Sequence, residues 1–252
     1  MERVSFYNRK GGIGKSTLAY NISFGLSKIN KKVCLLDLDS QKDSTNFLGT
    51  FLNGESKDYV GFDELFDASK KVSIENCLIE VRTNLYVISN RDLRTMETIL
   101  GKNIRAEKMF EEKINKLKEL GFDYVLYDCS PSLISKINDS ALCNSDSIVL
   151  PVQLQSAAIR ASANVANYLA ELYIDPSVIK CVIPNMKKST KESTKNLELV
   201  YKIFDVNIVT EAVKDKTRYT EASKYGKSIF EYDKDVAKEF METFRKVVNL
   251  IG

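Results

Sequence analysis

The sequence predicts an α/β fold in which helices cover both faces of a twisted, mostly parallel β-sheet. Short, continuously apolar runs, such as residues 33–36 and 124–127, alternate with longer stretches of helical spacing. Strands that are apolar on both sides are typical of a parallel sheet buried on both faces. A glycine-rich segment follows the short apolar run at residues 4–7. At 252 residues the length suits one large domain, and we expect a single domain over residues 1–252.

Each element is justified by its own pattern. Residues 105–120 place Phe110, Ile114 and Leu117 at helical spacing, and Gly121 follows as a left-handed cap would. Strands are expected at residues 3–8, 33–37, 77–81, 85–89, 124–128, 147–152, 178–184 and 207–209. Helices are expected at residues 14–29, 41–49, 62–66, 93–100, 105–120, 133–143, 157–173, 190–204, 218–224 and 234–250, and a polar loop at 53–58.

The composition excludes several kinds of chemistry. The chain has no histidine, so neither imidazole catalysis nor a histidine metal site is possible. Its cysteines form no C-x-x-C pair, which leaves zinc and redox motifs unsupported and favours a reducing, cytoplasmic compartment. They are Cys34, Cys77, Cys129, Cys143 and Cys181. A net charge of +3 does not by itself indicate nucleic-acid binding, and no run is long enough to predict a transmembrane helix.

The glycine-rich segment has the features of a phosphate-binding loop. It reads N-R-K-G-G-I-G-K-S-T over residues 8–17 and lies between a predicted strand and a predicted helix. Glycines allow the backbone to approach phosphate oxygens closely, and the helix N-terminus attracts the anion. Lys15 would then reach the β- and γ-phosphates, and the Ser16 hydroxyl would ligate Mg²⁺.

Three carboxylates follow predicted strands, at the edge where α/β sheets bind ligands. Asp128 ends the run Y-V-L-Y-D, which has the form of a Walker B strand, and would hold Mg²⁺ through water. Asp37 and Asp39 lie at the end of the run at 33–37. Each of the three alone would more simply cap the following helix. Their occurrence together beside a phosphate loop favours a role in catalysis or metal binding.

The segment K-G-G-I-G-K-S-T departs from the usual G-x-x-x-x-G-K-[ST] pattern and contains a second lysine, Lys10. In this it resembles the deviant Walker A motif of the ParA/MinD superfamily of P-loop ATPases. Residues 35–41, L-L-D-L-D-S-Q, resemble the switch I segment of that family. Residues 128–133, D-C-S-P-S-L, resemble switch II, with Ser130 in place of a proline. The similarity runs over essentially the whole chain and is closest to small, Soj-like ParA proteins, which lack an N-terminal helix-turn-helix domain.

The resemblance implies ATP and Mg²⁺ as ligands and a role for each matching residue. The residues expected to hold ATP are Lys10, Gly11, Gly12, Ile13, Gly14, Lys15, Ser16 and Thr17, with Pro184 and Asn185 at the adenine. Those expected around the metal are Ser16, Asp37, Asp39 and Asp128. Asp37 would sit in the outer shell, and Asp39 would orient the attacking water. Lys10 would reach the nucleotide of the other subunit in an ATP-dependent homodimer. For Asn185, a turn-capping role explains the residue about as well.

Two lysine-rich stretches are candidates for binding non-specific double-stranded DNA. The first contains Lys187, Lys188, Lys191 and Lys195, and the second contains Lys214, Lys216, Arg218, Lys224 and Lys227. The second overlaps R-Y-T-E-A-S-K-Y-G-K, which resembles a family segment whose arginine contributes to DNA binding in partition proteins. We assign the DNA contacts to Lys187, Lys188, Arg218, Lys224 and Lys227. Acidic residues are interspersed, so an ordinary solvated surface explains these lysines nearly as well.

The resemblance implies a cytoplasmic, nucleoid-associated ATPase that segregates a plasmid or chromosome with a ParB-like partner. One alternative is a MinD-like ATPase that acts at a membrane through the apolar side chains of residues 240–251, although packing of this helix on the sheet is the simpler interpretation. A second is an iron–sulfur reductase or carrier, which the cysteine spacing disfavours. A third is a nucleotide-gated module with negligible turnover, which the combination of Lys10, Lys15, Asp39 and Asp128 disfavours.

Overall fold

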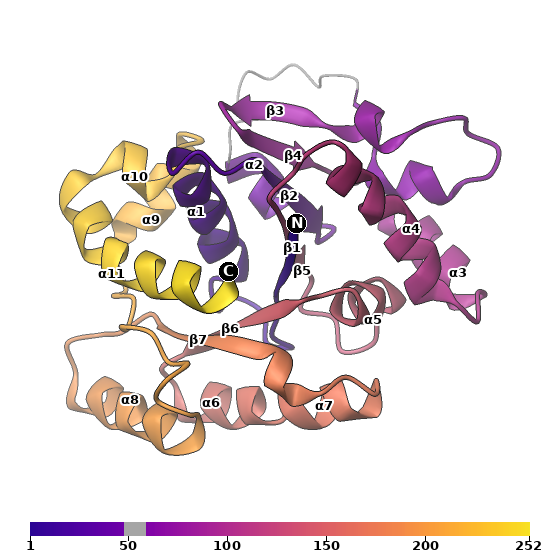
Figure 1. Ribbon diagram of the computed structural model, residues 1–252. Helices are drawn as coiled ribbons and strands as arrows, with labels where there is room; N and C mark the ends of the chain where they lie inside the picture. The colour runs from indigo at the N-terminus through magenta and orange to yellow at the C-terminus, as the bar shows by residue number, and fades with distance from the viewer. Residues whose placement is uncertain (48–58) are drawn as a thin grey trace.

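The computed structural model describes residues 1–47 and 59–252, and a β-sheet forms the centre of this part of the chain (Figure 1). The strands are β1 Glu2–Phe6, β2 Val33–Leu38, β3 Ile79–Arg82, β4 Leu85–Ile88, β5 Tyr124–Cys129, β6 Ser147–Gln153 and β7 Ile179–Asn185. Their order across the sheet is β3-β4-β2-β5-β1-β6-β7. Only the edge pair β3–β4 among these is antiparallel. The predicted α/β fold with a mostly parallel sheet is therefore confirmed.

Helices cover both faces of the sheet (Figure 1). The α-helices are α1 Lys15–Lys28, α2 Asp43–Phe47, α3 Leu93–Gly101, α4 Ala106–Glu119, α5 Lys136–Cys143, α6 Ser156–Ala163, α7 Val165–Glu171, α8 Lys191–Ile203, α9 Thr217–Lys224, α10 Ile229–Tyr232 and α11 Lys234–Ile251. Short 3₁₀ helices are η1 Phe62–Phe66, η2 Ile74–Cys77 and η3 Pro176–Val178. One hydrophobic cluster joins α1, α10 and α11 to the sheet, and the other joins α3 to α8 to its opposite face.

The strands supply side chains to both clusters in alternation, as their continuous apolarity predicts. In β5, Tyr124 and Leu126 pack in the cluster with α1 and α11, whereas Val125 and Tyr127 pack in the cluster with α4 and α5. All four are buried. Because side chains alternate across a strand, an unbroken apolar run is needed when both faces are covered. This burial fixes β5 in the middle of the sheet and so fixes the position of Asp128 near its end.

Several predicted boundaries need correction. The strand predicted at 207–209 is wrong: Val209 forms only an isolated bridge to Val182, because a turn precedes it and the chain bends away after one pair. The helix predicted at 157–173 is two helices, separated at Asn164. The helix predicted from 133 begins at Lys136, where the Ser135 side chain caps it. The predicted loop 53–58 and the last two residues of the predicted helix 41–49 lie outside the described residues.

The terminal helix α11 packs against the sheet and against α1. Its apolar side chains Phe240, Phe244, Val247 and Ile251 are buried. No helix in the described ranges combines the length and the apolarity needed to cross a membrane. At the crossing with α1, Gly25 lets the two helices approach, since a Cβ at this position would lie 2.4 Å from Cε2 of Phe244. The apolar face of α11 is thus used for packing within the chain.

We predict that Gly25→Ala destabilises the protein by about 1–3 kcal/mol, because the Phe244 ring is held by Phe230 and has to shift. Urea unfolding followed by circular dichroism measures this. Gly101→Ala is the control: it lies at the end of α3, where an added Cβ would have no atom within 4 Å. That change should be neutral or stabilising by up to about 1 kcal/mol. Equal effects of the two substitutions would contradict the packing described.

Candidate phosphate-binding site

The loop between β1 and α1 adopts the backbone conformation that its glycines predict. Gly12 has φ 70° and Gly14 has φ 89°, both in the left-handed region that favours glycine. A Cβ on Gly14 would also lie 2.3 Å from Nδ2 of Asn185. Gly14 is the N-cap of α1, and among the described residues no side chain caps its first turn. The free amides of that turn therefore remain available to an anion.

Lys15 begins α1 and is held inside the loop. Its side chain is buried, and Nζ donates a hydrogen bond to the Lys10 carbonyl at 3.3 Å. Burial lowers the pKa of Lys15, while the nearby carboxylates of Asp128 and Asp39 act in the opposite direction. A buried ammonium group without a directly bonded counter-ion is strongly attracted to a phosphate. The contact of Lys15 with the β- and γ-phosphates stays a prediction.

Asp128 lies beside this lysine, and one of its oxygens accepts no hydrogen bond from the part of the chain that the structure describes. The residue is fully buried, and Ser44 Oγ donates to its Oδ2 at 2.5 Å. Its Oδ1 is buried without a hydrogen bond among the described residues. Burial raises the pKa of Asp128, whereas the hydroxyls of Ser44 and Ser16 and the charge of Lys15 lower it. An orphaned carboxylate oxygen at a strand end is a site for a cation or its bound water.

Asp37 lies beside Asp128 on the neighbouring strand, because the two residues are partners in the register of β2 and β5. Both of its oxygens are engaged: Oδ1 accepts from the amide of Asp39, and Oδ2 accepts from the amide and hydroxyl of Thr45. Burial and the neighbouring Asp128 raise the pKa of Asp37. Asp37 therefore shapes the turn that carries Asp39, and its place in the outer shell of a metal stays a prediction.

These residues fit a magnesium ion bound together with a nucleotide. The described residues contain no group of three or more carboxylates or thiols that would form an all-protein metal cage. Mg²⁺ in nucleotide sites is held instead by one or two protein groups, phosphate oxygens and water. Ser16 and the orphaned Oδ1 of Asp128 would supply those groups.

Asp39 lies at the rim of the same edge and is half-buried. Its Oδ1 accepts a hydrogen bond from the amide of Gln41 at 3.0 Å. Asn90, at the end of the neighbouring strand β4, donates from Nδ2 to the carbonyls of Asp37 and Asp39 at 3.1 and 3.0 Å. Sequence reasoning missed Asn90, although its position just after a predicted strand was a usable signal.

Lys10 stands at the outer edge of the loop. Its Nζ donates to Oε1 of Gln155 at 3.4 Å, a long and exposed contact. Its amide is bonded to the side chain of Asn8, which is buried and in turn donates to the Pro151 carbonyl at 2.8 Å. The backbone of Lys10 is thus fixed, whereas its ammonium group is held only weakly.

A pocket adjoins the other side of the loop and includes Asn185. Asn185 donates from Nδ2 to the Ile13 carbonyl at 2.7 Å, while Pro184 is buried and its carbonyl accepts from the amide of Val213. The remaining lining includes Met186 and residues of the segment 213–220 that sequence reasoning did not connect with the loop. From that segment they are Val213, Lys214, Asp215, Lys216, Tyr219 and Thr220, whereas the loop and α1 contribute Gly14, Thr17 and Leu18. Of the two predicted adenine residues, Asn185 therefore faces this pocket through its side chain.

The predicted DNA-binding residues are exposed, and some of them already have acidic partners. Arg218 pairs with Glu221 at 2.7 Å and with Asp233 at 3.2 Å. Lys188 lies 3.8 Å from Asp215. Lys224 and Lys227 are exposed and Lys187 is partly so. The DNA contacts therefore stay a prediction. The structure shows ion pairs of Arg218 and Lys188 that the sequence could not reveal.

Of the five cysteines, Cys34, Cys77, Cys129 and Cys181 are buried in the core. Burial raises the pKa of Cys77 and of Cys129 to about 12, so both remain neutral thiols. These buried thiols cannot face a second subunit, which is the arrangement that an iron–sulfur carrier of this fold would need.

Comparison with known proteins agrees with this geometry. A family model described as an AAA domain matches residues 1–177. The chain is 29% identical to the sporulation initiation inhibitor protein Soj of Bacillus subtilis, over 91% of this chain and 90% of Soj. It is 24% identical to the chromosome partitioning protein ParA of Caulobacter vibrioides, over 98% and 93% of the two chains.

Among solved structures, a putative plasmid partition protein of Borrelia burgdorferi bound to AMPPNP superimposes with a TM-score of 0.83. The two chains are 21% identical, and 98% of each is covered. The loop, the strand-end carboxylates and these similarities together define a P-loop ATPase fold. The chain belongs to the ParA/MinD superfamily of P-loop ATPases. Within that superfamily it is similar to the Soj-like ParA proteins.

The buried carboxylate gives a prediction about pH. Burial raises the pKa of Asp128 from 3.8 to about 6. Between these two pH values the folded protein therefore keeps a proton on Asp128 that the unfolded chain has lost. The contribution of Asp128 to stability is therefore largest at low pH and falls as pH rises to about 6. Asp128→Asn removes this loss of stability at higher pH, because the amide does not ionise. Without nucleotide or Mg²⁺, the variant should gain about 1–3 kcal/mol relative to wild type between pH 4 and pH 7.5.

Urea unfolding at a series of pH values measures this difference. Glu112→Gln is the control, because it removes one negative charge from an exposed position on α4. A gain for Asp128→Asn that does not depend on pH, or that is matched by Glu112→Gln, would contradict the account of Asp128.

Proposed function

We propose that this protein is a ParA-type partition ATPase that binds MgATP, dimerises around it and then binds non-specific DNA. The observation that carries the proposal is the orphaned Oδ1 of Asp128, buried beside Lys15 and Ser16 at the carboxyl edge of the sheet. The loop from Lys10 to Thr17 would enclose the triphosphate. Ser16 and Asp128 would hold Mg²⁺, which would neutralise charge on the phosphates during transfer.

Hydrolysis needs an oriented water and positive charge near the transferred phosphoryl group. Asp39, held at the rim by Asn90 and Gln41, would orient the water. Lys15 supplies one positive charge from within the loop. Lys10 would supply a second to the nucleotide of the other subunit, and its weak contact with Gln155 leaves it free to do so. Turnover is then coupled to dimerisation and is slow without a partner.

The adenine ring would lie in the pocket formed by Thr17, Asn185, Met186, Asp215 and Thr220. This pocket adjoins the first turn of α1, so a base placed there leaves the phosphates in the loop. The segment 213–220 would contact the base, and the same segment carries several of the lysines considered for DNA binding.

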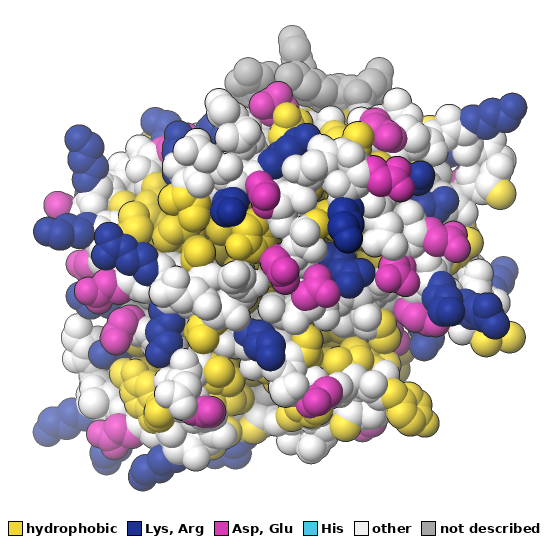
Figure 2. Space-filling model, in the orientation of Figure 1, with side chains coloured by type: hydrophobic (Ala, Val, Ile, Leu, Met, Phe, Trp, Pro, Cys, Tyr) yellow, Lys and Arg dark blue, Asp and Glu magenta, His cyan; other side chains and the backbone are white. Residues whose placement is uncertain are grey.

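The cellular role follows from the relatives' names and from the surface charge. Relatives named for chromosome or plasmid partition support segregation with a ParB-like partner that stimulates hydrolysis, in the cytoplasm on the nucleoid. Basic and acidic side chains are intermixed on the face shown in Figure 2. DNA binding would therefore use a few local lysines and depend strongly on salt. The MinD-like alternative needs the apolar face of α11, which is buried.

We predict that Asp39→Ala binds ATP with near wild-type affinity but loses most hydrolysis, at least about tenfold, and accumulates as an ATP dimer. Calorimetry, phosphate release and light scattering measure the three properties. Lys15→Ala is the matched control, because loss of the buried ammonium should abolish nucleotide binding itself. Normal turnover by Asp39→Ala would remove Asp39 from its role.

We further predict ATP-dependent binding to a DNA duplex of arbitrary sequence, weakening steeply between about 50 and 300 mM salt. Fluorescence anisotropy measures the affinity, and Arg218→Ala should reduce it by about two- to tenfold. Sedimentation with anionic liposomes is the parallel test of the MinD-like alternative. Binding to liposomes without binding to DNA would overturn the partition proposal.

A further inference from the structure

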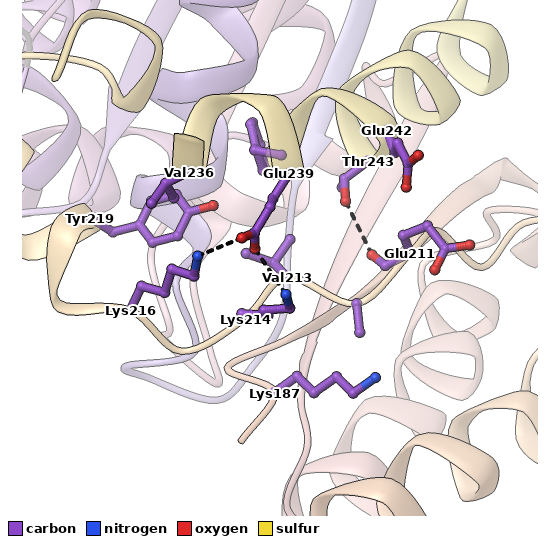
Figure 3. Close-up of a pocket in the computed structure, with 12 residues that line it drawn as sticks. Lys187, Glu211, Val213, Lys214, Lys216, Tyr219, Val236, Glu239, Glu242 and Thr243 are labelled. Atoms are coloured by element: carbon purple, nitrogen blue, oxygen red, sulfur yellow. Dashed lines mark hydrogen bonds and ion pairs between the residues drawn. The ribbon is translucent and has the colours of Figure 1, made fainter. Parts of the chain in front are cut away.

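A cavity beside α11 brings together lysines from both of the basic stretches (Figure 3). Lys187 and Lys214 are far apart in sequence but form an isolated parallel bridge. The amide of Lys187 donates to the Val213 carbonyl, and the amide of Asp215 donates to the Lys187 carbonyl, both at 3.0 Å. Three lysines line the cavity as a result, namely Lys187, Lys214 and Lys216. The two stretches that the sequence presents separately therefore meet at this cavity.

Glu239 forms ion pairs with two of these lysines. Its Oε2 lies 3.1 Å from Nζ of Lys214, and its Oε1 lies 2.8 Å from Nζ of Lys216. Figure 3 shows the carboxylate between the two ammonium groups. The lysines lower the pKa of Glu239, so it is ionised at neutral pH. Its position on α11 is fixed because Val236 and Phe240, on the buried side of the same helix, pack in the core.

A carboxylate in this position resembles a DNA phosphate. Both groups carry one negative charge and present two free oxygens, and each Glu239 oxygen takes one lysine as each phosphate oxygen would. Lys187, in contrast, has no ion pair within the described ranges. An incoming phosphate therefore meets Lys187 directly but has to displace Glu239 from the other two lysines.

We propose that Glu239 is an internal counter-ion that competes with DNA phosphates for Lys214 and Lys216 and so limits DNA binding by this surface. The inference rests on the proposed DNA-binding function and adds the residues and the competitor. The pairs are partly exposed, with 58% and 27% exposure for the two lysine side chains, so they oppose DNA only weakly. Glu239 thus lowers the affinity for DNA by a modest factor.

The test compares Glu239→Gln with Glu242→Gln by fluorescence anisotropy with ATP and a duplex of arbitrary sequence. Glu242 lines the same cavity, one turn along α11, but makes no ion pair with a described residue. Both variants lose one negative charge. We expect Glu239→Gln to bind DNA about three- to tenfold more tightly at about 100 mM salt, with a steeper salt dependence by about one to two ions. Glu242→Gln should change affinity less than about twofold.

A second comparison repeats the test in a variant in which both Lys214 and Lys216 are replaced by Gln. In that background Glu239→Gln should change affinity no more than Glu242→Gln does, because the groups for which it competes are gone. If wild type binds DNA but Glu239→Gln matches Glu242→Gln, the counter-ion inference is wrong and the partition proposal stands. If neither wild type nor Glu239→Gln binds DNA while both bind ATP, both proposals fall.

Discussion

A buried carboxylate beside a buried lysine is the constraint on which the rest of this structure depends. Asp128 and Lys15 are both removed from water, and neither charge is fully satisfied by the residues that the structure describes. Unsatisfied buried charge is costly, so the surrounding fold has to hold both groups in place. The central position of β5 and the packing of α1 beneath α11 do so. A magnesium-bound triphosphate is a ligand that would satisfy the ammonium and the carboxylate together.

The charges of the segment 213–220 are of another kind than those of Lys15 and Asp128. Lys214, Lys216 and Arg218 are partly or largely exposed and are paired with carboxylates. Exposed pairs contribute little energy and exchange readily, which would suit the proposed binding and release of DNA. Because this segment lines both the pocket beside the phosphate loop and the lysine cavity, one short stretch of chain connects the two.

Much of the fold could be predicted from the sequence because its signals are local. Continuous apolar runs indicated the buried strands, and Gly121, with φ 76°, ends α4 as its position predicts. The loop around Lys15 was visible because close backbone approach to phosphate requires glycines at set positions. The strand predicted at 207–209 failed because two apolar residues, Ile208 and Val209, indicate burial but not pairing, and pairing depends on where β7 lies.

Other parts of the site required the folded chain. Ser44 and Thr45, which hold Asp128 and Asp37, come from a segment whose sequence indicates only a helix. Met186 and Asp215 reach the pocket beside the phosphate loop only because the chain returns beside β7. The partners of Arg218 and Lys214 lie on other elements, so no local pattern revealed that these cations are paired. Long-range pairing of exposed charges leaves no trace in sequence spacing.

The most direct test of the central claim is the dependence of ATP binding on Mg²⁺, measured by calorimetry for wild type and for Asp128→Asn. If Asp128 holds the metal, Mg²⁺ should strengthen ATP binding to wild type by at least about tenfold, or about 1.4 kcal/mol. In Asp128→Asn most of that gain should be lost, while binding of ATP without Mg²⁺ should be preserved or improved. An equal Mg²⁺ dependence in the two proteins would contradict the account.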